Sequence, residues 1–330
     1  MDKDFALSPF AVWTPPQRKL YRVVRNLWRS KRPVRIIIVK PRQTGISTLV
    51  EGLAYNHAGH NDNRRVLITA QEEDPALINI YSMFQRFHSS QPDALQPKLQ
   101  RDSMEMMTFG NGSRISHKTA ALGATRKKES GKGRGATYSF FHGSEVAYWT
   151  VPDRFFSGIE DGIPDRHGTF VFLESTANGV GNWFHRRWVR AAKGWRMVQS
   201  QSGTPRWTMV DKYPTSWVPF FISWLEQPEY YRHLTETDRD YYDKHLDKDE
   251  RRLVDEFGAS LEQIEWRRYQ IDKKDGDTQM FMQEYPVEPS EAFIFSGRKV
   301  FDMGALRWYM DASRQREADS PAKRGRLVVT

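Results

Sequence analysis

One junction constrains this chain more than any other part of the sequence. The apolar run VRIIIV at 34–39 passes directly into the loop KPRQTG and then into a segment with helical spacing. A buried strand, a short glycine-containing loop and a helix, in that order, surround phosphate groups with backbone N–H groups, and the usual wording is G-x-x-x-x-G-K-[ST]. Gly45 and Ser47 match this wording, but Ile46 stands at the lysine position and Lys40 at the first glycine position.

Two cations are close enough in the sequence to replace the missing lysine. The loop curls around the phosphates, so a lysine at its first residue can point inward from the strand end, and we predict Lys40 as the phosphate cation. Arg42 is the second candidate. The predicted nucleotide-binding residues here are Lys40, Gln43, Thr44, Gly45, Ser47 and Thr48, with the Ser47 hydroxyl toward Mg²⁺. An ordinary strand, turn and helix in a basic protein is the alternative.

Strands and helices alternate along the first half of the sequence. Residues 64–70 form a second predicted strand, an amphipathic helix follows it, and 137–145 and 168–179 are further predicted strands. Strands joined by helical crossovers predict an α/β fold with a mainly parallel sheet. The turn FGNGSR at 109–114 predicts a hairpin between them.

Polar residues stand at the C-terminal tips of two predicted strands, which is where open α/β sheets bind their ligands. Enzymes that hydrolyse ATP on such a sheet need an acid at a strand end to handle Mg²⁺ and orient water, and Glu145 is the candidate. Ser175 and Thr176 offer hydroxyls that could sense a γ-phosphate. A solvent-facing carboxylate and simple turn chemistry are the respective alternatives.

The composition limits the classes of partner. Lys and Arg outnumber Asp and Glu by 50 to 41, which gives a net charge of +9 and favours polyanionic partners such as nucleic acid. An evenly solvated basic surface is the alternative. The sequence has no cysteine, which excludes disulfides and thiolate metal sites. The apolar window WVPFFISWL at 217–225 is far shorter than the roughly 20 residues that span a bilayer, so we expect no membrane segment.

The sequence changes character near residue 230, where long charged helices begin. Ser260 and Gln263 have the spacing of a capping box and predict the start of one of these helices. Two prolines interrupt the helical spacing within 284–297, and a polar, basic tail follows. The sequence therefore predicts a helical part after the sheet.

Five motifs, in order and at compatible spacing, resemble those of one protein family. They are KPRQTGIST, RGATYSFFHGSEVAYW, FLESTANGVGNWF, WLEQPEY and QEYPVEPSEAF. From about residue 10 to about 302 the chain resembles the large terminase subunit of tailed bacteriophages, the motor that pumps viral DNA into a procapsid. The resemblance implies an ATPase with a P-loop NTPase fold of the additional-strand type, flanking helices, and a small helical lid or linker subdomain.

The resemblance also implies residue roles. Some members of the family carry the phosphate lysine at the start of the loop, which is the place of Lys40. The implied catalytic residues are Glu145 as the carboxylate and Arg134 as an arginine finger for a neighbouring subunit. Arg42, the second candidate cation of the loop, is also predicted to be catalytic. The motif that couples hydrolysis to movement corresponds to Ser175, Thr176 and Ala177, and the adenine-side residues correspond to Trp13 and Gln17.

Two departures from the family pattern concern charge at the site. Ile46 cannot act as a phosphate lysine, and Ser144 stands where an aspartate usually contacts Mg²⁺. Metal binding is therefore expected to depend on Ser47 and Glu145. The expected cofactors are ATP and Mg²⁺.

The expected domains are an ATPase core at 1–230, a helical lid or linker at 231–297, and a linker at 298–330 toward a nuclease domain that is not expected in this chain. By resemblance, the partners are double-stranded DNA, the procapsid portal protein, the small terminase subunit and further copies in a ring. The expected location is the host cytoplasm, transiently at the portal vertex. Another P-loop translocase or helicase-like ATPase, and a non-catalytic nucleic-acid-binding module, are the alternatives.

Overall fold

The computed structural model describes residues 12–71, 75–120, 137–199, 205–209, 216–293 and 312. Residues Met1–Ile294 form one compact unit and Phe295–Thr330 a second. Of the predicted linker at 298–330 only Ala312 is described, so its role stays a prediction. The predicted division at residue 230 likewise stays a prediction. Among the described residues, no helix combines the length and the apolar character that crossing a membrane requires.

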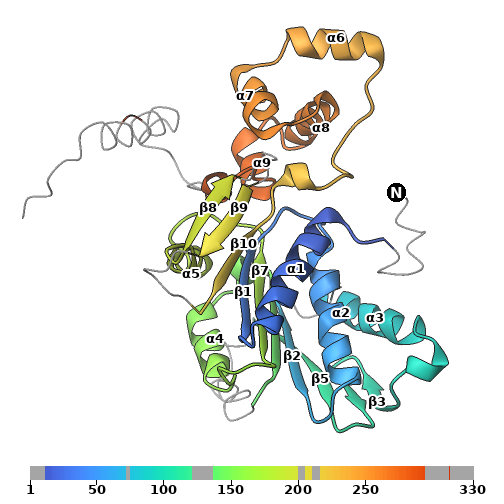
Figure 1. Ribbon diagram of the computed structural model, residues 1–330. Coiled ribbons are helices and arrows are strands. Elements are labelled where there is room, and N and C mark those ends of the chain that lie inside the picture. The colour runs from blue at the N-terminus through green and yellow to red at the C-terminus, as the bar shows by residue number, and fades with distance from the viewer. Residues whose placement is uncertain are drawn as a thin grey trace, which may run out of the picture. The chain divides into compact units, whose positions relative to one another are not determined.

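The first unit is built on an eight-stranded sheet in the order β10-β1-β7-β6-β2-β5-β4-β3 (Figure 1). The strands are β1 Val34–Val39, β2 Arg65–Ala70, β3 Leu99–Ser103, β4 Met106–Phe109, β5 Arg114–Thr119, β6 Phe140–Ser144, β7 Phe170–Ser175 and β10 Val218–Phe221. All pairs from β10 to β5 are parallel, whereas β4 and β3 are antiparallel. The predicted mainly parallel sheet and the hairpin are therefore confirmed.

The strand order defines the subclass of the fold. β1 leads into the phosphate-type loop and β6 leads into Glu145, and β7 is inserted between them. An extra strand at this place is the additional-strand arrangement of P-loop NTPases, so the predicted fold class is confirmed. β3 and β10 were not predicted, nor was the separate antiparallel pair β8 Trp195–Gln199 and β9 Pro205–Met209.

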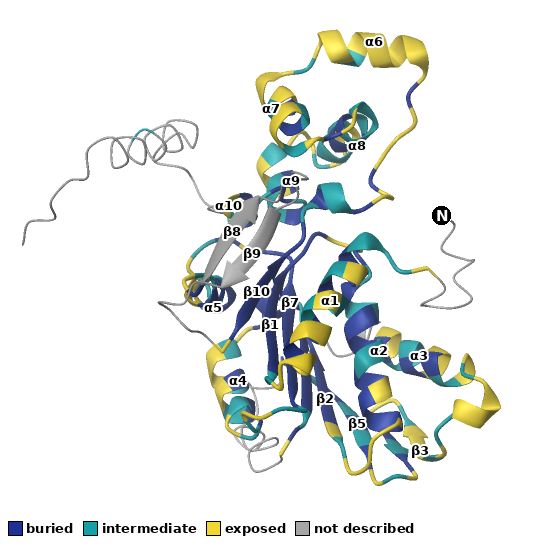
Figure 2. Ribbon diagram, viewed as in Figure 1, coloured by how far each residue is buried: buried dark blue, intermediate teal, exposed yellow. Residues whose placement is uncertain are grey.

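The two faces of the sheet bury separate apolar clusters. Along β1, Ile36 and Ile38 pack into one cluster and Ile37 and Val39 into the other, since successive side chains of a strand point to opposite faces. The first cluster lies under α1 Pro15–Arg29, α2 Ile46–Gly59 and α3 Pro75–Ser89, and the second under α4 Pro152–Glu160 and α5 Trp183–Ala192. Figure 2 shows the central strands as buried. Burial on both faces explains why VRIIIV is continuously apolar.

A third cluster holds a helical segment at 224–293. Its elements are the 3₁₀ turn Trp224–Glu226, α6 Glu236–Lys244, α7 Lys248–Phe257, α8 Leu261–Asp272, α9 Thr278–Glu284 and α10 Pro289–Ala292. Trp224 stacks on Trp266 with ring centroids 5.4 Å apart, and Phe281 packs edge-on against Trp224. The predicted capping box is confirmed, because Gln263 N donates to Ser260 Oγ at 3.2 Å and Ser260 N donates to Gln263 Oε1 at 3.1 Å.

Candidate active site

The loop between β1 and α2 has the backbone geometry of a phosphate cradle. Gln43 has φ 56° and Gly45 has φ 72°, both in the left-handed region. Gly45 is the N-cap of α2 and provides no side-chain cap, so the helix start presents backbone N–H groups that an anion can use. A Cβ at position 45 would lie 2.9 Å from Gln17 Nε2, so close packing also requires the glycine.

The start of α1 holds this loop from outside. Gln17 Nε2 donates to Gly45 O at 2.8 Å, and Gln17 Oε1 accepts from Thr14 N at 3.0 Å. Thr14 Oγ1 donates to Thr44 O at 3.5 Å, and Trp13 packs edge-on against Tyr21. Both ends of the buried Gln17 amide are therefore engaged by the chain itself. Contacts of Trp13 and Gln17 with an adenine base stay predictions.

Lys40 lies at the carboxyl end of β1 between two carboxylates. Its Nζ is 3.2 Å from Glu145 Oε1 and 3.9 Å from Glu174 Oε2, and its side chain is 7% exposed. Burial by itself would lower the pKa of Lys40, but the charges of Glu174 and Glu145 outweigh it and raise the pKa above the usual value. Lys40 is therefore a fixed ammonium at the mouth of the loop.

Glu145 follows β6 in a strained backbone conformation, with φ 52°. Left-handed backbone at a non-glycine residue costs about 1 kcal/mol or more and is found preferentially at functional sites. The carboxylate is 37% exposed, so it reaches the surface of the site while it contacts Lys40. This geometry suits a carboxylate that must meet water.

The residues that follow β7 contact Glu145 directly. Ser175 Oγ donates to Glu145 Oε2 at 3.3 Å, and Thr176 Oγ1 lies 3.5 Å from the same oxygen. Tyr148 Oη donates to Ala177 O at 3.1 Å, which ties the segment after Glu145 to the end of β7. The structure thus brings together the predicted carboxylate and the three predicted coupling residues.

Three buried residues of the site were missed by sequence reasoning. Glu174 in β7, His142 in β6 and Glu51 in α2 are each no more than 1% exposed. His142 Nε2 lies 3.2 Å from Glu174 Oε1, and its Nδ1 lies 3.7 Å from Glu51 Oε1. The available signal was a polar residue inside each apolar strand, FFHGS and FVFLES.

The pKa values of the two buried acids are shifted in opposite directions. Burial alone would raise the pKa of Glu174, but the Lys40 ammonium and the contacts with His142 and Ser47 hold it at about 2. Burial and the nearby charge of Glu174 raise the pKa of Glu51 well above its usual range. The site therefore favours the ionised form of Glu174 and the neutral form of Glu51.

The predicted metal residues fit Mg²⁺ chemistry only in part. Ser47 Oγ donates to Glu174 Oε1 at 2.5 Å, and no contact joins Ser47 to Glu145 among the described side chains. Within the described residues no group of three His, Cys, Asp or Glu side chains could hold a metal. Mg²⁺ bound with a nucleotide needs few protein ligands, because phosphates and water supply the others, so a hydroxyl beside a carboxylate suits it.

The predicted arginines have different outcomes. Arg42 Nη2 lies 2.9 Å from Glu284 Oε1 of α9, and Tyr230 Oη donates to Arg42 O. Arg42 therefore links the loop to the helical segment, and its charge also acts on Lys40 and Glu145. A catalytic role of Arg42 stays a prediction. Arg134 lies outside the described residues. Thr48 lies in the first turn of α2, and its contact with a nucleotide stays a prediction.

A cavity of about 570 Å³ lies at the opposite edge of the sheet, where β2, β6 and β7 begin. Arg64, Arg65, Tyr138 and Arg166 are among its lining residues, and no carboxylate of the described residues lines it. None of the residues discussed above faces this cavity. The chemistry-bearing side chains are therefore gathered at the carboxyl edge.

No protein-family model matches this sequence, and no curated protein matches it. Among solved structures, the chain is similar to the large terminase ATPase domain of Thermus phage P74-26, with 18% identity and a TM-score of 0.48 over 87% of this chain and 98% of that one. The large terminase of another thermophilic bacteriophage gives 12% identity and a TM-score of 0.46 over 72% of this chain and 51% of that one. The HK97 bacteriophage large terminase gives 14% identity and a TM-score of 0.45 over 77% of this chain and 46% of that one. In fold, the chain is similar to large terminases of several phages.

Proposed function

We propose that this chain is the ATPase part of a viral DNA-packaging motor that couples ATP hydrolysis to translocation of double-stranded DNA into a procapsid. The observation that carries the proposal is the meeting of Lys40, Glu145 and Ser175 at one sheet edge, beside the uncapped start of α2. A cation, a carboxylate and a phosphate cradle are the parts that phosphoryl transfer to water requires. The five sequence motifs add the packaging role.

The site geometry suggests a division of roles. Lys40 would neutralise charge on the transferring phosphoryl group, and Glu145 would orient water and accept its proton. Mg²⁺, when bound, would neutralise phosphate oxygens. Lys40 now pairs with Glu145, so a γ-phosphate that attracts the ammonium would free the carboxylate for water.

The contacts of Glu145 also suggest how hydrolysis would reach the rest of the chain. Ser175 and Thr176 donate to the same carboxylate oxygen. A change in the charge or position of Glu145 would therefore change the hydrogen bonds of the residues at the end of β7. This supports the role of Ser175, Thr176 and Ala177 in coupling.

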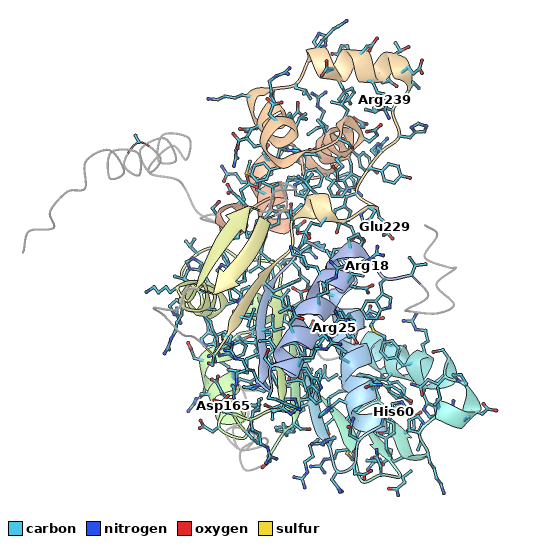
Figure 3. The ribbon with its side chains drawn as sticks, viewed as in Figure 1. Arg18, Arg25, His60, Asp165, Glu229 and Arg239 are labelled. Atoms are coloured by element: carbon cyan, nitrogen blue, oxygen red, sulfur yellow. The ribbon has the colours of Figure 1, made fainter. Side chains whose placement is uncertain are left out.

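An exposed row of arginines supports a polyanionic partner. Arg18, Arg22, Arg25 and Arg29 lie three or four residues apart on α1 and are exposed, and Figure 3 labels Arg18 and Arg25 on this helix. α1 contains no acidic residue, and none of the four pairs with an acid among the described residues. Guanidinium groups in such a row suit phosphates of a DNA backbone.

The remaining partners follow from the resemblance alone. They are the portal protein, the small terminase subunit and further copies in a ring, at the portal vertex in the host cytoplasm. Arg134 would serve a neighbour's site in that ring. An arginine supplied in trans is worth on the order of 10³-fold or more in turnover, so an isolated chain would hydrolyse ATP slowly.

The deciding experiment measures phosphate release from ATP by the purified chain, alone, with DNA, and with DNA and portal-bearing procapsids. We expect slow basal release and stimulation only when procapsids and DNA are both present. Stimulation by DNA alone would favour another translocase. A chain that binds DNA but no nucleotide would be a non-catalytic binding module.

A further inference from the structure

The strand that leads to Glu145 lacks the acid that usually precedes it. Ser144 occupies that position, at the end of β6. Its Oγ donates to Glu174 Oε1 at 3.2 Å. The same carboxylate oxygen accepts from Ser47 Oγ at 2.5 Å. Glu174 thus joins the serine that replaces the missing acid to the serine that is expected to face Mg²⁺.

The sheet register explains this meeting. Glu174 pairs with Ile38 of β1 on one side and with Ser144 of β6 on the other. Residues paired in adjacent parallel strands point to the same face, and Ile38 packs in the cluster beneath α2. The Glu174 side chain therefore points under the start of α2, where Ser47 lies. The insertion of β7 between β1 and β6 is what puts a carboxylate of β7 at this place.

We propose that Glu174 supplies, from the inserted strand β7, the metal-facing carboxylate that position 144 lacks. This inference rests on the proposed ATPase function. Mg²⁺ prefers oxygen ligands and keeps several waters, so an ionised carboxylate beside the Ser47 hydroxyl suits its ligand sphere. One oxygen of Glu174, Oε2, accepts no hydrogen bond from any described group, and its nearest charged neighbour is the Lys40 ammonium at 3.9 Å.

His142 positions this carboxylate. Its ring lies between Glu174 and Glu51, at 3.2 Å and 3.7 Å, and is fully buried. Carboxylates toward a metal are commonly fixed by a second residue behind them, and loss of that residue costs about 10–100-fold in metal affinity. Neither ring nitrogen of His142 makes a hydrogen bond with a described group, so the ring would position Glu174 through packing and close approach.

A competing role for Glu174 is to neutralise Lys40. Their charged atoms are 3.9 Å apart, whereas Glu145 approaches Lys40 to 3.2 Å. Glu145 is thus the nearer partner of Lys40, and Ser47 and Ser144 are the nearer partners of Glu174. The two roles predict different dependence on Mg²⁺, which makes them separable.

The test measures the affinity of a fluorescent, non-hydrolysable ATP analogue with Mg²⁺ and with EDTA. The ratio of the affinity in Mg²⁺ to the affinity in EDTA measures how much the metal strengthens nucleotide binding. For Glu174→Gln we expect this ratio to fall about tenfold or more, while the affinity in EDTA stays close to that of the unchanged chain. Binding of Mn²⁺ to the nucleotide complex, followed by electron paramagnetic resonance, should weaken in parallel. Ser144→Asp combined with Glu174→Gln should restore much of the metal dependence.

Glu51→Gln is the control: it replaces another buried acid of the cluster by its amide, but at a side chain that favours its neutral form and that has no contact with Ser47 among the described residues. It should keep the metal dependence of the unchanged chain. If Glu174→Gln does not fold, Glu174→Asp is the second variant. It keeps the negative charge but moves the carboxylate away from Ser47, so it should weaken Mn²⁺ binding.

Three results would overturn the inference. Unchanged tightening by Mg²⁺ in Glu174→Gln would exclude the metal role. An equal loss of affinity with Mg²⁺ and with EDTA would assign Glu174 to Lys40. Failure of the unchanged chain to bind any nucleotide would reject the proposed function itself.

Discussion

Buried and half-buried carboxylates gather in two regions of the molecule, the carboxyl edge of the sheet and the helical segment, and their partners differ. In the helical segment, Glu250 accepts from Arg268 Nε and Nη2, both at 2.7 Å, and Arg267 lies 3.6 Å away. At the sheet edge, Glu145 and Glu174 share Lys40 and otherwise accept mainly from hydroxyls.

The two regions differ in whether the carboxylate oxygens all accept hydrogen bonds. Arg268 meets both oxygens of Glu250, which also caps α7 by accepting from Asp247 N. At the sheet edge, Glu51 Oε2 and Glu174 Oε2 accept no hydrogen bond from a described group. Buried polar groups are usually satisfied, and exceptions mark catalytic sites or places for an ion or water. Acids at the sheet edge should thus serve chemistry, and those of the helical segment stability.

The largest expected effect is that of Glu145→Gln. The amide keeps the shape but cannot accept a proton, so hydrolysis should fall by about 10²–10⁴-fold while ATP still binds. Single-turnover phosphate release and analogue binding measure the two separately. If binding and hydrolysis fell together, Glu145 would be a metal-binding or structural residue.

Lys40→Ala should reduce turnover by on the order of 10²-fold or more, because it removes charge stabilisation of the transferring phosphoryl group. Ile46→Val is the control at the position where the standard loop carries lysine. Ile46 is buried in the core, so the control removes only one methyl group, at about 1 kcal/mol of stability. Steady-state rates of ATP hydrolysis are measured for both variants. If Ile46→Val were slow and Lys40→Ala remained active, Lys40 would not be the phosphate cation.

In the helical segment, Glu250→Gln should lower the free energy of unfolding by about 3 kcal/mol, since it leaves two arginines near an uncharged buried group. Glu256→Gln removes an exposed partner of Arg252 and should cost less than about 0.5 kcal/mol. Urea denaturation followed by circular dichroism compares them. A large loss of basal ATPase in Glu250→Gln without a loss of stability would contradict the comparison.

Glu51 in α2 and Glu250 in the helical segment should respond to pH in opposite ways. Burial by itself would raise the pKa of Glu250, but the contacts with Arg268 and Arg267 outweigh burial and lower the pKa. The ionised Glu250 therefore stabilises the fold above about pH 4.5, and this stabilisation is lost as the pH falls. Glu51 has a raised pKa, so folding loses stability as the pH rises from about 4.5 toward that pKa. Glu51→Gln should therefore gain stability relative to the unchanged chain over this rise. Denaturation midpoints at several pH values test it; a constant difference would mean that Glu51 is ionised.

The smallest effect is expected from the exposed charges of α1. Replacing Arg22 and Arg25 by Gln should weaken binding to double-stranded DNA by a few-fold. It should also reduce the slope of the logarithm of the affinity against the logarithm of the salt concentration by about two. Stability should change by less than about 0.5 kcal/mol, because the side chains are exposed. Fluorescence anisotropy at several salt concentrations measures this. An unchanged salt dependence would remove α1 from the DNA-binding surface.

The local features of the fold could be predicted from the sequence. The bounds of β1, the start of α2 and the Ser260 capping box depend on residues that are neighbours in the chain. The meeting of Lys40, Glu145 and Ser175 was also predictable in outline, because the carboxyl ends of parallel strands lie at one edge. Hydrophobic period, glycine and polar strand ends carried that information.

Only the tertiary structure decided which acid stands beside which serine. The register of β7 between β1 and β6 sets the place of Glu174, and register depends on contacts between segments far apart in the sequence. The same holds for β10, whose Pro219 is tolerated because β10 is an edge strand, and for Arg42, whose partner Glu284 comes from the helical segment. A pattern along the chain determines which residues are buried, but their neighbours are fixed only when the sheet order and register form.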